Sequence, residues 1–206
     1  MPAVAIPRLL LSALLLVLLA GCASRPAAPE GGRQPGDWAA QQARVEALDT
    51  WTLIGKAGLR TPQESTSANL DWSQYPHYYR LLISGPFGSG RHLLEGREGR
   101  FSLTNAEGRF EAATPEALMR EQLGWSLPVG ALGDWVRGLP AEERPYRLET
   151  DALGFPRHLE QDGWAIDYRD WRRVDALWLP RRLVMTYDEV RVTLVVNEWR
   201  PQPDAS

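Results

Sequence analysis

The stretch that decides the fold of this 206-residue chain reads Leu81-Leu82-Ile83-Ser84-Gly85-Pro86-Phe87-Gly88-Ser89-Gly90. An apolar strand runs here into a tight turn, because glycine and proline favour a reversal of the chain. Turns normally lie on the surface, so Phe87 at the tip is expected to be exposed. A hairpin tip whose phenylalanine folds back on its neighbours is the open alternative, since isolated exposed apolar residues are common.

On both sides of this turn, apolar residues alternate with polar ones, which predicts short antiparallel strands. The Asp162-Gly163 pair is typical of a two-residue hairpin turn between two of them. The expected strands cover residues 51–60, 67–72, 78–83, 92–94, 101–103, 110–112, 146–148, 156–160, 164–171, 178–186 and 190–199.

Three helices interrupt this pattern. The first is expected from an N-cap at Asp37 to about Leu48, and the second starts at Thr114-Pro115-Glu116, where a capping hydroxyl precedes a proline. A third, short helix follows Pro128 and ends at Gly138. About ten strands and three helices predict an α+β domain, a strongly curved antiparallel sheet with helices packed on one face.

The N-terminus has the layout of a secretory signal. Residues 9–19 are almost wholly apolar and too short to span a bilayer, and Leu19-Ala20-Gly21-Cys22 follows, which resembles the bacterial lipobox. We therefore expect a signal peptide over residues 1–21, lipid attachment at Cys22, a Pro/Gly-rich tether to residue 36 and a folded domain over 37–206. The residue directly after Cys22 is Ala23 and not the Asp that is associated with inner-membrane retention. This favours sorting to the periplasmic face of the outer membrane.

Charge and cysteine content narrow the possible functions. Removal of residues 1–21 leaves 22 basic against 26 acidic residues, so the mature chain is mildly acidic. This balance gives no electrostatic reason to bind nucleic acid. Because Cys22 is the only cysteine, no disulfide can form within the chain and the core must supply stability.

Catalytic motifs are not found. His77, His92 and His158 are scattered and lack the spacing of a metal site, so no metal is expected. Ser89 lacks the flanking glycines of a nucleophile elbow, and the nearby glycines do not form a dinucleotide fingerprint. The acidic residues are best explained as solvated surface. Neither catalysis nor a cofactor is predicted.

Tryptophan is unusually frequent, with nine residues in 206. A domain of this size does not need so many to fill its core, and tryptophan often lines concave sites for apolar ligands. For any single tryptophan, ordinary core packing remains the simpler interpretation.

Together with the lipobox, the segments Tyr79–Ser89 and Leu132–Pro140 resemble the LolB family, outer-membrane receptors of the lipoprotein localisation pathway. The resemblance implies an incomplete β-barrel lidded by helices around an apolar cavity. It also implies a monomer that accepts acylated lipoproteins from the periplasmic carrier LolA and inserts them into the outer membrane, without a cofactor.

The resemblance also implies roles for single residues. Phe87, flanked by Pro86 and Gly88, occupies the turn position where the family has a protruding apolar residue, usually leucine, that is needed for membrane insertion. Four tryptophans match aromatic positions of the family and are expected in or near the cavity: Trp72, Trp135, Trp164 and Trp199. Strand alternation adds Leu70, Leu81, Ile83 and Leu93 as expected cavity residues.

Two alternatives stay open. The chain could be an outer-membrane-anchored protein that binds phospholipid in the same cavity. It could also be a sensor lipoprotein whose cavity is closed and whose Phe87 docks a partner protein. An enzyme is the least supported class, because no acid, base or nucleophile constellation is found.

Overall fold

The structure, a computed structural model, describes residues 32–97 and 99–202. The expected signal peptide and the expected lipidation of Cys22 lie outside these residues. From Gln34 onward the chain forms one compact unit. In the part of the chain described, no helix combines the length and apolar character needed to cross a bilayer.

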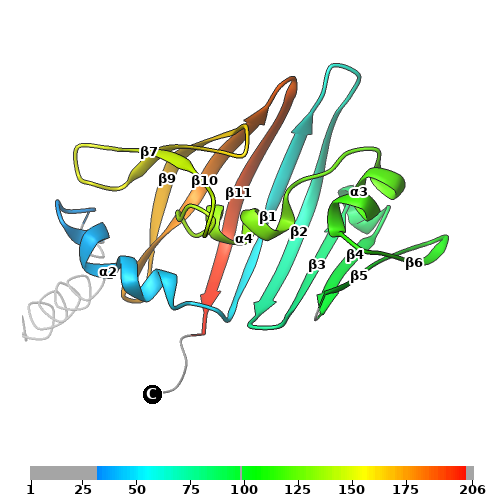
Figure 1. Cartoon of the computed structure of the whole chain (residues 1–206), viewed down its shortest axis with the longest axis horizontal. Helices are drawn as coiled ribbons and strands as arrows, with labels where there is room; N and C mark the ends of the chain where they lie inside the picture. Colours follow the sequence, from blue (N-terminus) through cyan, green and yellow to red (C-terminus); the bar gives the residue numbers. More distant parts are fainter. Residues whose placement is uncertain (1–31, 98, 203–206) are drawn as a thin grey trace, which may run out of the picture. The chain divides into compact units, whose positions relative to one another are not determined.

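An antiparallel sheet of eleven strands forms the body of this unit, in the order β6-β5-β4-β3-β2-β1-β11-β10-β9-β8-β7 (Figure 1). The first six strands are β1 (Trp51–Arg60), β2 (Ser65–Tyr75), β3 (Tyr78–Ser84), β4 (His92–Arg97), β5 (Arg100–Asn105) and β6 (Gly108–Ala112). The other five are β7 (Tyr146–Thr150), β8 (Pro156–Gln161), β9 (Trp164–Val174), β10 (Leu177–Tyr187) and β11 (Val190–Pro201).

The sheet is open rather than closed. Each strand pairs with its neighbour in the chain, except that β1 pairs with β11 and so joins the two halves, which leaves β6 and β7 as the edges. The predicted α+β class and incomplete barrel are confirmed. Each of the eleven segments expected as strands overlaps one strand of the sheet.

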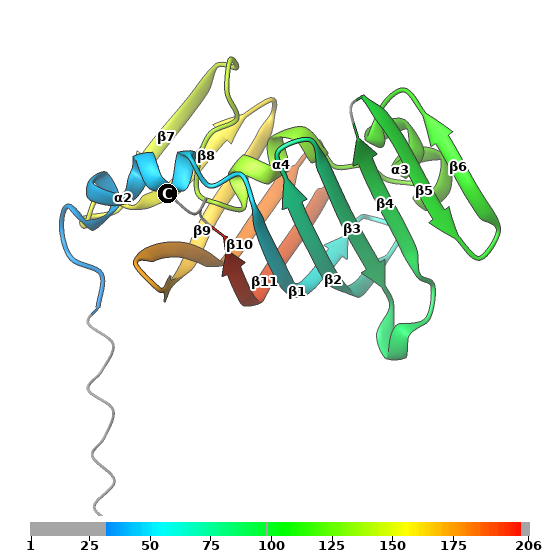
Figure 2. The ribbon, with the colours of Figure 1, turned by 90° about the horizontal axis from the view of Figure 1, so that it is seen from below.

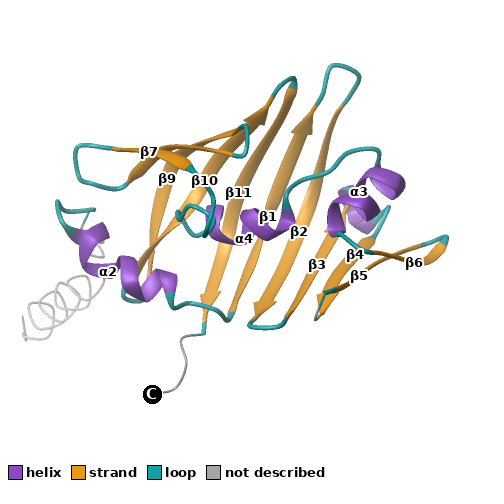
Figure 3. Ribbon diagram, in the orientation of Figure 1, coloured by secondary structure: helices purple, strands orange, loops and turns teal. Residues whose placement is uncertain are grey.

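Three helices lie across one face of the sheet (Figure 3): α2 (Asp37–Glu46), α3 (Pro115–Leu123) and α4 (Val129–Trp135). The predicted start of α3 is confirmed, because the Thr114 hydroxyl accepts a hydrogen bond from the Ala117 N–H at 3.2 Å. For α2 the predicted cap is displaced by one residue. Gly36 is the N-cap, and the Asp37 carboxylate instead accepts from the Gln34 N–H at 2.8 Å.

A row of apolar side chains fixes the face of the sheet that the helices cover. Leu53, Trp72, Leu81, Leu94 and Leu103 are successive cross-strand partners from β1 to β5, and all five are buried. Cross-strand partners point to the same side of a sheet, so this row defines the inner face. The core lies between it and the helices.

Side-chain hydrogen bonds hold α4 and the loop after it against the sheet and the end of α2. Trp135 donates through Nε1 to Gln161 Oε1 at 2.8 Å, and the Tyr168 hydroxyl donates to the Trp135 carbonyl at 2.9 Å. Arg137 donates to the carbonyls of Val45 and Leu48, both at 2.8 Å. The short helix thus connects β8 and β9 with the end of α2.

Asp134 and Gly138 complete this arrangement. The Asp134 carboxylate pairs with the Arg137 guanidinium, and both groups are largely buried. Gly138 has a φ of 88°, and a Cβ placed there would lie 2.6 Å from the Trp171 ring. Glycine is therefore required at this position by both the backbone conformation and the close packing.

Candidate functional site

An apolar cavity lies between the inner face of the sheet and the segment from α3 to α4. Strands β1, β2, β3, β10 and β11 form one wall, with the side chains of Ala57, Leu59, Thr66, Ala68, Leu70, Trp72, Leu81, Ile83, Met185, Val192 and Leu194. The facing wall comes from the helical segment, with Met119, Trp125, Leu127, Val129 and Leu132.

The lining has almost no polar character. Thr66 is the single polar residue among the described residues that line the cavity. The cavity volume is about 70 Å³, whereas sites for drug-sized ligands enclose about 300–1,000 Å³. In this conformation the site is apolar but nearly closed.

The helical wall is a candidate lid, because its centre is a loop rather than a helix. Trp125 and Leu127 lie between the end of α3 and the start of α4. The Glu116 carboxylate accepts a hydrogen bond from the Val129 N–H at 3.1 Å. This bond links the first turn of α3 to the first residue of α4 and closes the lid segment into a loop.

Four of the predicted cavity residues line the cavity: Leu70, Trp72, Leu81 and Ile83. They belong to two neighbouring strands, and Leu70 pairs with Ile83 while Trp72 pairs with Leu81. The four therefore form a continuous patch on one side of the site. The family resemblance selected Trp72, and strand alternation selected the three aliphatic residues.

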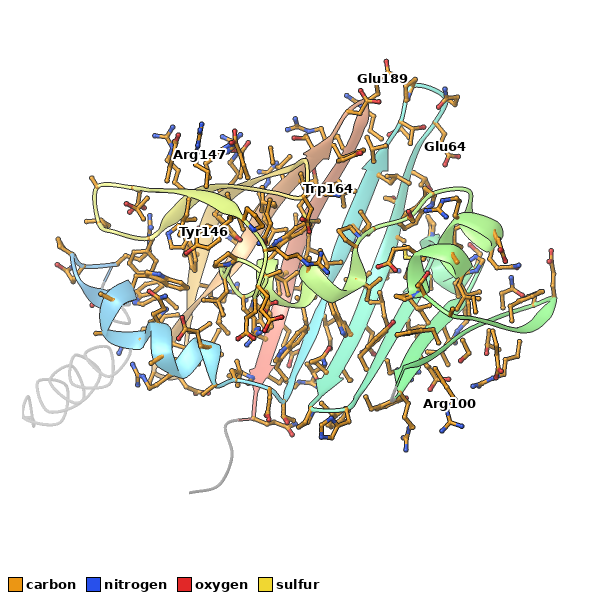
Figure 4. The ribbon with its side chains drawn as sticks, viewed as in Figure 1. Glu64, Arg100, Tyr146, Arg147, Trp164 and Glu189 are labelled. Atoms are coloured by element: carbon orange, nitrogen blue, oxygen red, sulfur yellow. The ribbon has the colours of Figure 1, made fainter. Side chains whose placement is uncertain are left out.

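The other three tryptophans on the predicted list lie outside the cavity lining. Trp135, the last residue of α4, is fully buried, and Trp164 packs on it with ring centroids 6.2 Å apart. Figure 4 places Trp164 on the side of the sheet where Tyr146 and Arg147 of β7 lie. Trp199 packs against Trp51 with centroids 5.3 Å apart. These three residues form core, which was the simpler interpretation.

Leu93 requires a correction as well. It pairs with Leu82, whereas the neighbouring Leu94 pairs with the inward Leu81. Leu93 therefore faces the outer surface, and Leu94 is the buried residue of this strand. The short apolar run Leu93-Leu94 does not reveal which residue points inward, and a one-residue error reverses the face.

The lid residues were not predicted as part of the site. Met119, Trp125 and Leu127 line the cavity from the helical side. The helical period of α3 could have indicated that Met119 is buried, but it does not indicate which part of the sheet the helix covers. No sequence signal identified Trp125 and Leu127, because they belong to a loop.

Two buried side-chain donors on β2 and β3 have no hydrogen-bond partner among the described residues. They are the Trp72 indole N–H and the Tyr79 hydroxyl, and both are buried. Burial raises the pKa of Tyr79 above its ordinary value of 10.0, and the nearby Glu116 adds to the rise. The Tyr79 hydroxyl therefore remains a protonated donor at neutral pH.

The β3–β4 turn is the second element of the site. Phe87 is the middle residue of the one-turn 3-10 helix η2 (Pro86–Gly88), and Pro86 and Gly88 are exposed. Figure 2 shows this turn extending beyond the neighbouring strand ends, on the side of the sheet away from α4. Residue 87 thus lies at a projecting tip.

The turn is stabilised by its own hydrogen bonds. The Gly85 N–H donates to the Ser89 carbonyl at 2.7 Å, and the Ser89 hydroxyl donates to the Pro86 carbonyl at 2.9 Å. Neither bond uses the side chain of residue 87. The backbone can therefore hold its shape when that side chain is replaced.

Within residues 32–97 and 99–202, no group of three or more His, Cys, Asp or Glu is placed to hold a metal ion. His158 is bound to Asp167, 2.8 Å from Nδ1 to Oδ1, on adjacent strands. This hydrogen bond raises the pKa of His158 above 6.5. The pair lies on β8 and β9, and neither residue lines the cavity.

Solved structures share the fold at low sequence identity. A DUF1329 family protein from Desulfovibrio piger aligns with a TM-score of 0.53 and 10% identity, over 82% of this chain and 92% of that protein. A LolA superfamily protein from Nitrosomonas europaea aligns with a TM-score of 0.51 and 9% identity, over 78% and 93%. These similarities show the fold alone.

Sequence comparison identifies the family. The model of the family "Outer membrane lipoprotein LolB" matches residues 49–199. The chain is 61% identical to the outer-membrane lipoprotein LolB of Chromohalobacter salexigens, over 96% of this chain and 92% of that protein. It is 44% identical to the corresponding protein of Pseudomonas fluorescens, over 91% and 93%. The predicted resemblance is confirmed, and the chain belongs to the LolB family of outer-membrane lipoproteins.

Proposed function

We propose that the protein takes the acyl chains of a lipoprotein into the cavity between sheet and lid, and then releases the lipoprotein into the outer membrane. The donor is the periplasmic carrier LolA. The protein acts as a receptor, and the transfer requires neither a cofactor nor a covalent step. The almost wholly apolar lining of the cavity is the observation that supports this function best.

The cavity lining explains how cargo can move without a nucleotide. An acyl chain that passes from one apolar cavity into another does not need to enter water. The large free-energy cost of exposing it to water is therefore avoided. Direction then depends only on the difference in affinity, and each tenfold difference corresponds to about 1.4 kcal/mol. A receptor with slightly higher affinity than the carrier is sufficient.

Cargo binding requires the lid to move. A cavity of about 70 Å³ is smaller than typical ligand sites. The loop that carries Trp125 and Leu127 is the part of the wall without regular secondary structure. We expect this loop to swing away from Leu70 and Ile83 when acyl chains enter.

The projecting turn supplies the membrane step. An apolar side chain such as Phe87 gains about 1.5–3 kcal/mol when it is buried in acyl chains. We propose that Phe87 enters the bilayer and brings the loaded domain to the membrane. Lipid attachment at Cys22 and the tether to residue 36 would keep the domain close to that membrane while it turns between carrier and bilayer.

Replacement of Phe87 by Glu tests this role. The variant should fold and should accept an acylated lipoprotein from the purified carrier, but it should not release the lipoprotein into liposomes. Phe87→Leu is the matched control, because it keeps an apolar tip and should retain release. Normal insertion by the Phe87→Glu variant would rule out the membrane role of this residue.

The same assay separates the receptor from a phospholipid carrier, since the cavity would also accommodate the acyl chains of a phospholipid. A protein that copurifies with phospholipid and exchanges it, but never accepts a lipoprotein from the carrier, would be a phospholipid-binding protein. Depletion in cells tests the sensor alternative. A receptor predicts lipoproteins that stall before the outer membrane, whereas a sensor predicts altered gene expression with normal sorting.

A further inference from the structure

A shallow groove of about 580 Å³ lies on the outer face of the sheet beside the projecting turn. Two leucines, Leu82 and Leu93, form its apolar centre and are cross-strand partners on β3 and β4. Arg80 and Arg91 line the same groove. Gly88 also belongs to the lining, so the groove is continuous with the turn.

Both arginines are free to bind an anion. The cross-strand neighbour of Arg80 is Glu95, but this carboxylate already accepts from the Tyr78 hydroxyl at 2.7 Å and pairs with Arg109 at 3.6 Å. Arg80 and Arg91 have no carboxylate within ion-pair distance among the described residues. One carboxylate, Glu107 in the β5–β6 turn, lines the opposite part of the groove.

We infer that this turn groove (Arg80, Leu82, Arg91 and Leu93) lies against the membrane during insertion, with its arginines bound to the phosphates of phospholipid head groups. Guanidinium groups bind phosphate oxygens through paired hydrogen bonds. Their long stems can bend toward the head groups while the leucines contact the acyl boundary. The inference rests on the proposed function and extends it to a defined lipid-binding surface.

The basic character of the turn groove contrasts with the mildly acidic charge of the whole chain. With 22 basic and 26 acidic residues after residue 21, the protein as a whole is not attracted to anionic lipid. An orienting contact must therefore come from a region where cations lack partners. The turn groove provides such a region next to the proposed insertion tip, so the same approach to the bilayer engages both.

Vesicle binding tests the inference without carrier or cargo. The protein used is the mature chain with the single substitution Cys22→Ala, which prevents attachment of the proposed lipid anchor. The vesicles contain equal parts of phosphatidylethanolamine and phosphatidylglycerol. Arg80→Gln combined with Arg91→Gln should weaken partitioning about 25-fold, since each cation near such a surface contributes about fivefold. Glu107→Gln should strengthen it about fivefold.

Arg157→Gln combined with Arg182→Gln is the matched control. Both arginines are exposed, lie on β8 and β10, and have no carboxylate partner among the described residues. The control changes the net charge by the same amount and should alter partitioning less than about twofold. High salt should reduce the difference between the two double variants.

Several results would overturn the inference: partitioning of the Arg80/Arg91 double variant within about twofold of the parent, an equal loss in the control, or weaker binding by Glu107→Gln. The proposed function fails separately. If the Arg80/Arg91 variant binds vesicles normally while Phe87→Glu does not, the groove is wrong and the insertion tip stands. If the groove behaves as expected but the carrier never transfers cargo, the receptor function is wrong.

Discussion

The two segments that carry the family resemblance differ sharply in their physical surroundings. In Leu132–Pro140, the side chains of Trp135 and Arg137 are fixed by hydrogen bonds to β8 and to the end of α2. The β3–β4 turn makes its hydrogen bonds within itself and extends beyond the sheet. The segment Leu132–Pro140 therefore belongs to the core, whereas the β3–β4 turn projects away from it.

This difference shows that a recognisable motif need not mark a functional surface. Substitutions in the α4 segment should destabilise the protein, and any loss of transfer would follow from the loss of structure. Substitutions at the turn should leave the fold intact and affect only the membrane step. Stability measurements can therefore separate the two roles before any transfer assay is performed.

The largest expected effect is at Arg137. Arg137→Met removes the cation that faces the Asp134 carboxylate and leaves the carbonyls of Val45 and Leu48 without this donor. Loss of one partner from a buried ion pair costs about 3–5 kcal/mol. We expect a decrease of this size in the free energy of unfolding, measured by urea denaturation and tryptophan fluorescence.

Two controls sharpen this prediction. Arg144→Met breaks an exposed pair with Asp162 and should cost at most about 1 kcal/mol. Burial already raises the pKa of Asp134 above 3.8 although Arg137 opposes this, and removal of Arg137 should raise it further. Protonation then removes the unpaired charge, so the destabilisation should be smaller at acidic than at neutral pH. A pH-independent loss would contradict the ion-pair explanation.

A pair of glycine substitutions compares the two segments directly. Gly138 and Gly88 have similar backbone angles, with φ of 88° and 79°. At Gly138 a Cβ meets the rings of Trp171 and Trp38, at 2.6 and 3.1 Å, whereas at Gly88 it meets open space. Gly138→Ala should cost about 2–4 kcal/mol through backbone strain and overpacking. Gly88→Ala should cost about 1 kcal/mol, from strain alone.

Thermal unfolding of both variants, measured side by side, checks the comparison. The difference between them isolates the contribution of packing, since the backbone strain is similar. Equal losses would mean that the α4 segment tolerates displacement of Trp171, and the contrast between the two segments would disappear.

The smallest expected effect lies outside both segments, at His158. Its hydrogen bond with Asp167 raises its pKa above 6.5 in the folded state, so the folded protein binds the proton more tightly than the unfolded chain. The resulting stabilisation is complete below pH 6.5 and disappears as the pH rises through the folded pKa. The difference in melting temperature between wild type and His158→Gln should therefore shrink from pH 5.5 to pH 8.5, by about 1–3 °C in total. A gap that grows with pH would refute this assignment.

The sequence predicted the secondary structure closely where local chemistry determines it. Thr114 and Pro115 define the start of α3, and turn residues separate the strands at nearly every predicted position. Alternation also identified Leu70, Leu81 and Ile83 on the inner face. These features depend on neighbouring residues, so one sequence is enough to predict them.

The cavity could be predicted only in part, because its shape depends on tertiary packing. Alternation could not choose between Leu93 and Leu94, where two leucines are adjacent. Nor could it separate Trp72, which lines the cavity, from Trp199, whose indole N–H donates to the Pro180 carbonyl within the core. The lid residues Trp125 and Leu127 were missed because their position depends on where two helices settle on the sheet.

The small volume of the empty cavity has a consequence for turnover. With no cargo, Trp125 and Leu127 already cover the apolar wall that the acyl chains would cover. Under the proposed function, each acyl chain that enters must displace these contacts, and their re-formation favours the empty state. Closure of the lid then favours release of the cargo and prepares the receptor for the next one without an external source of energy.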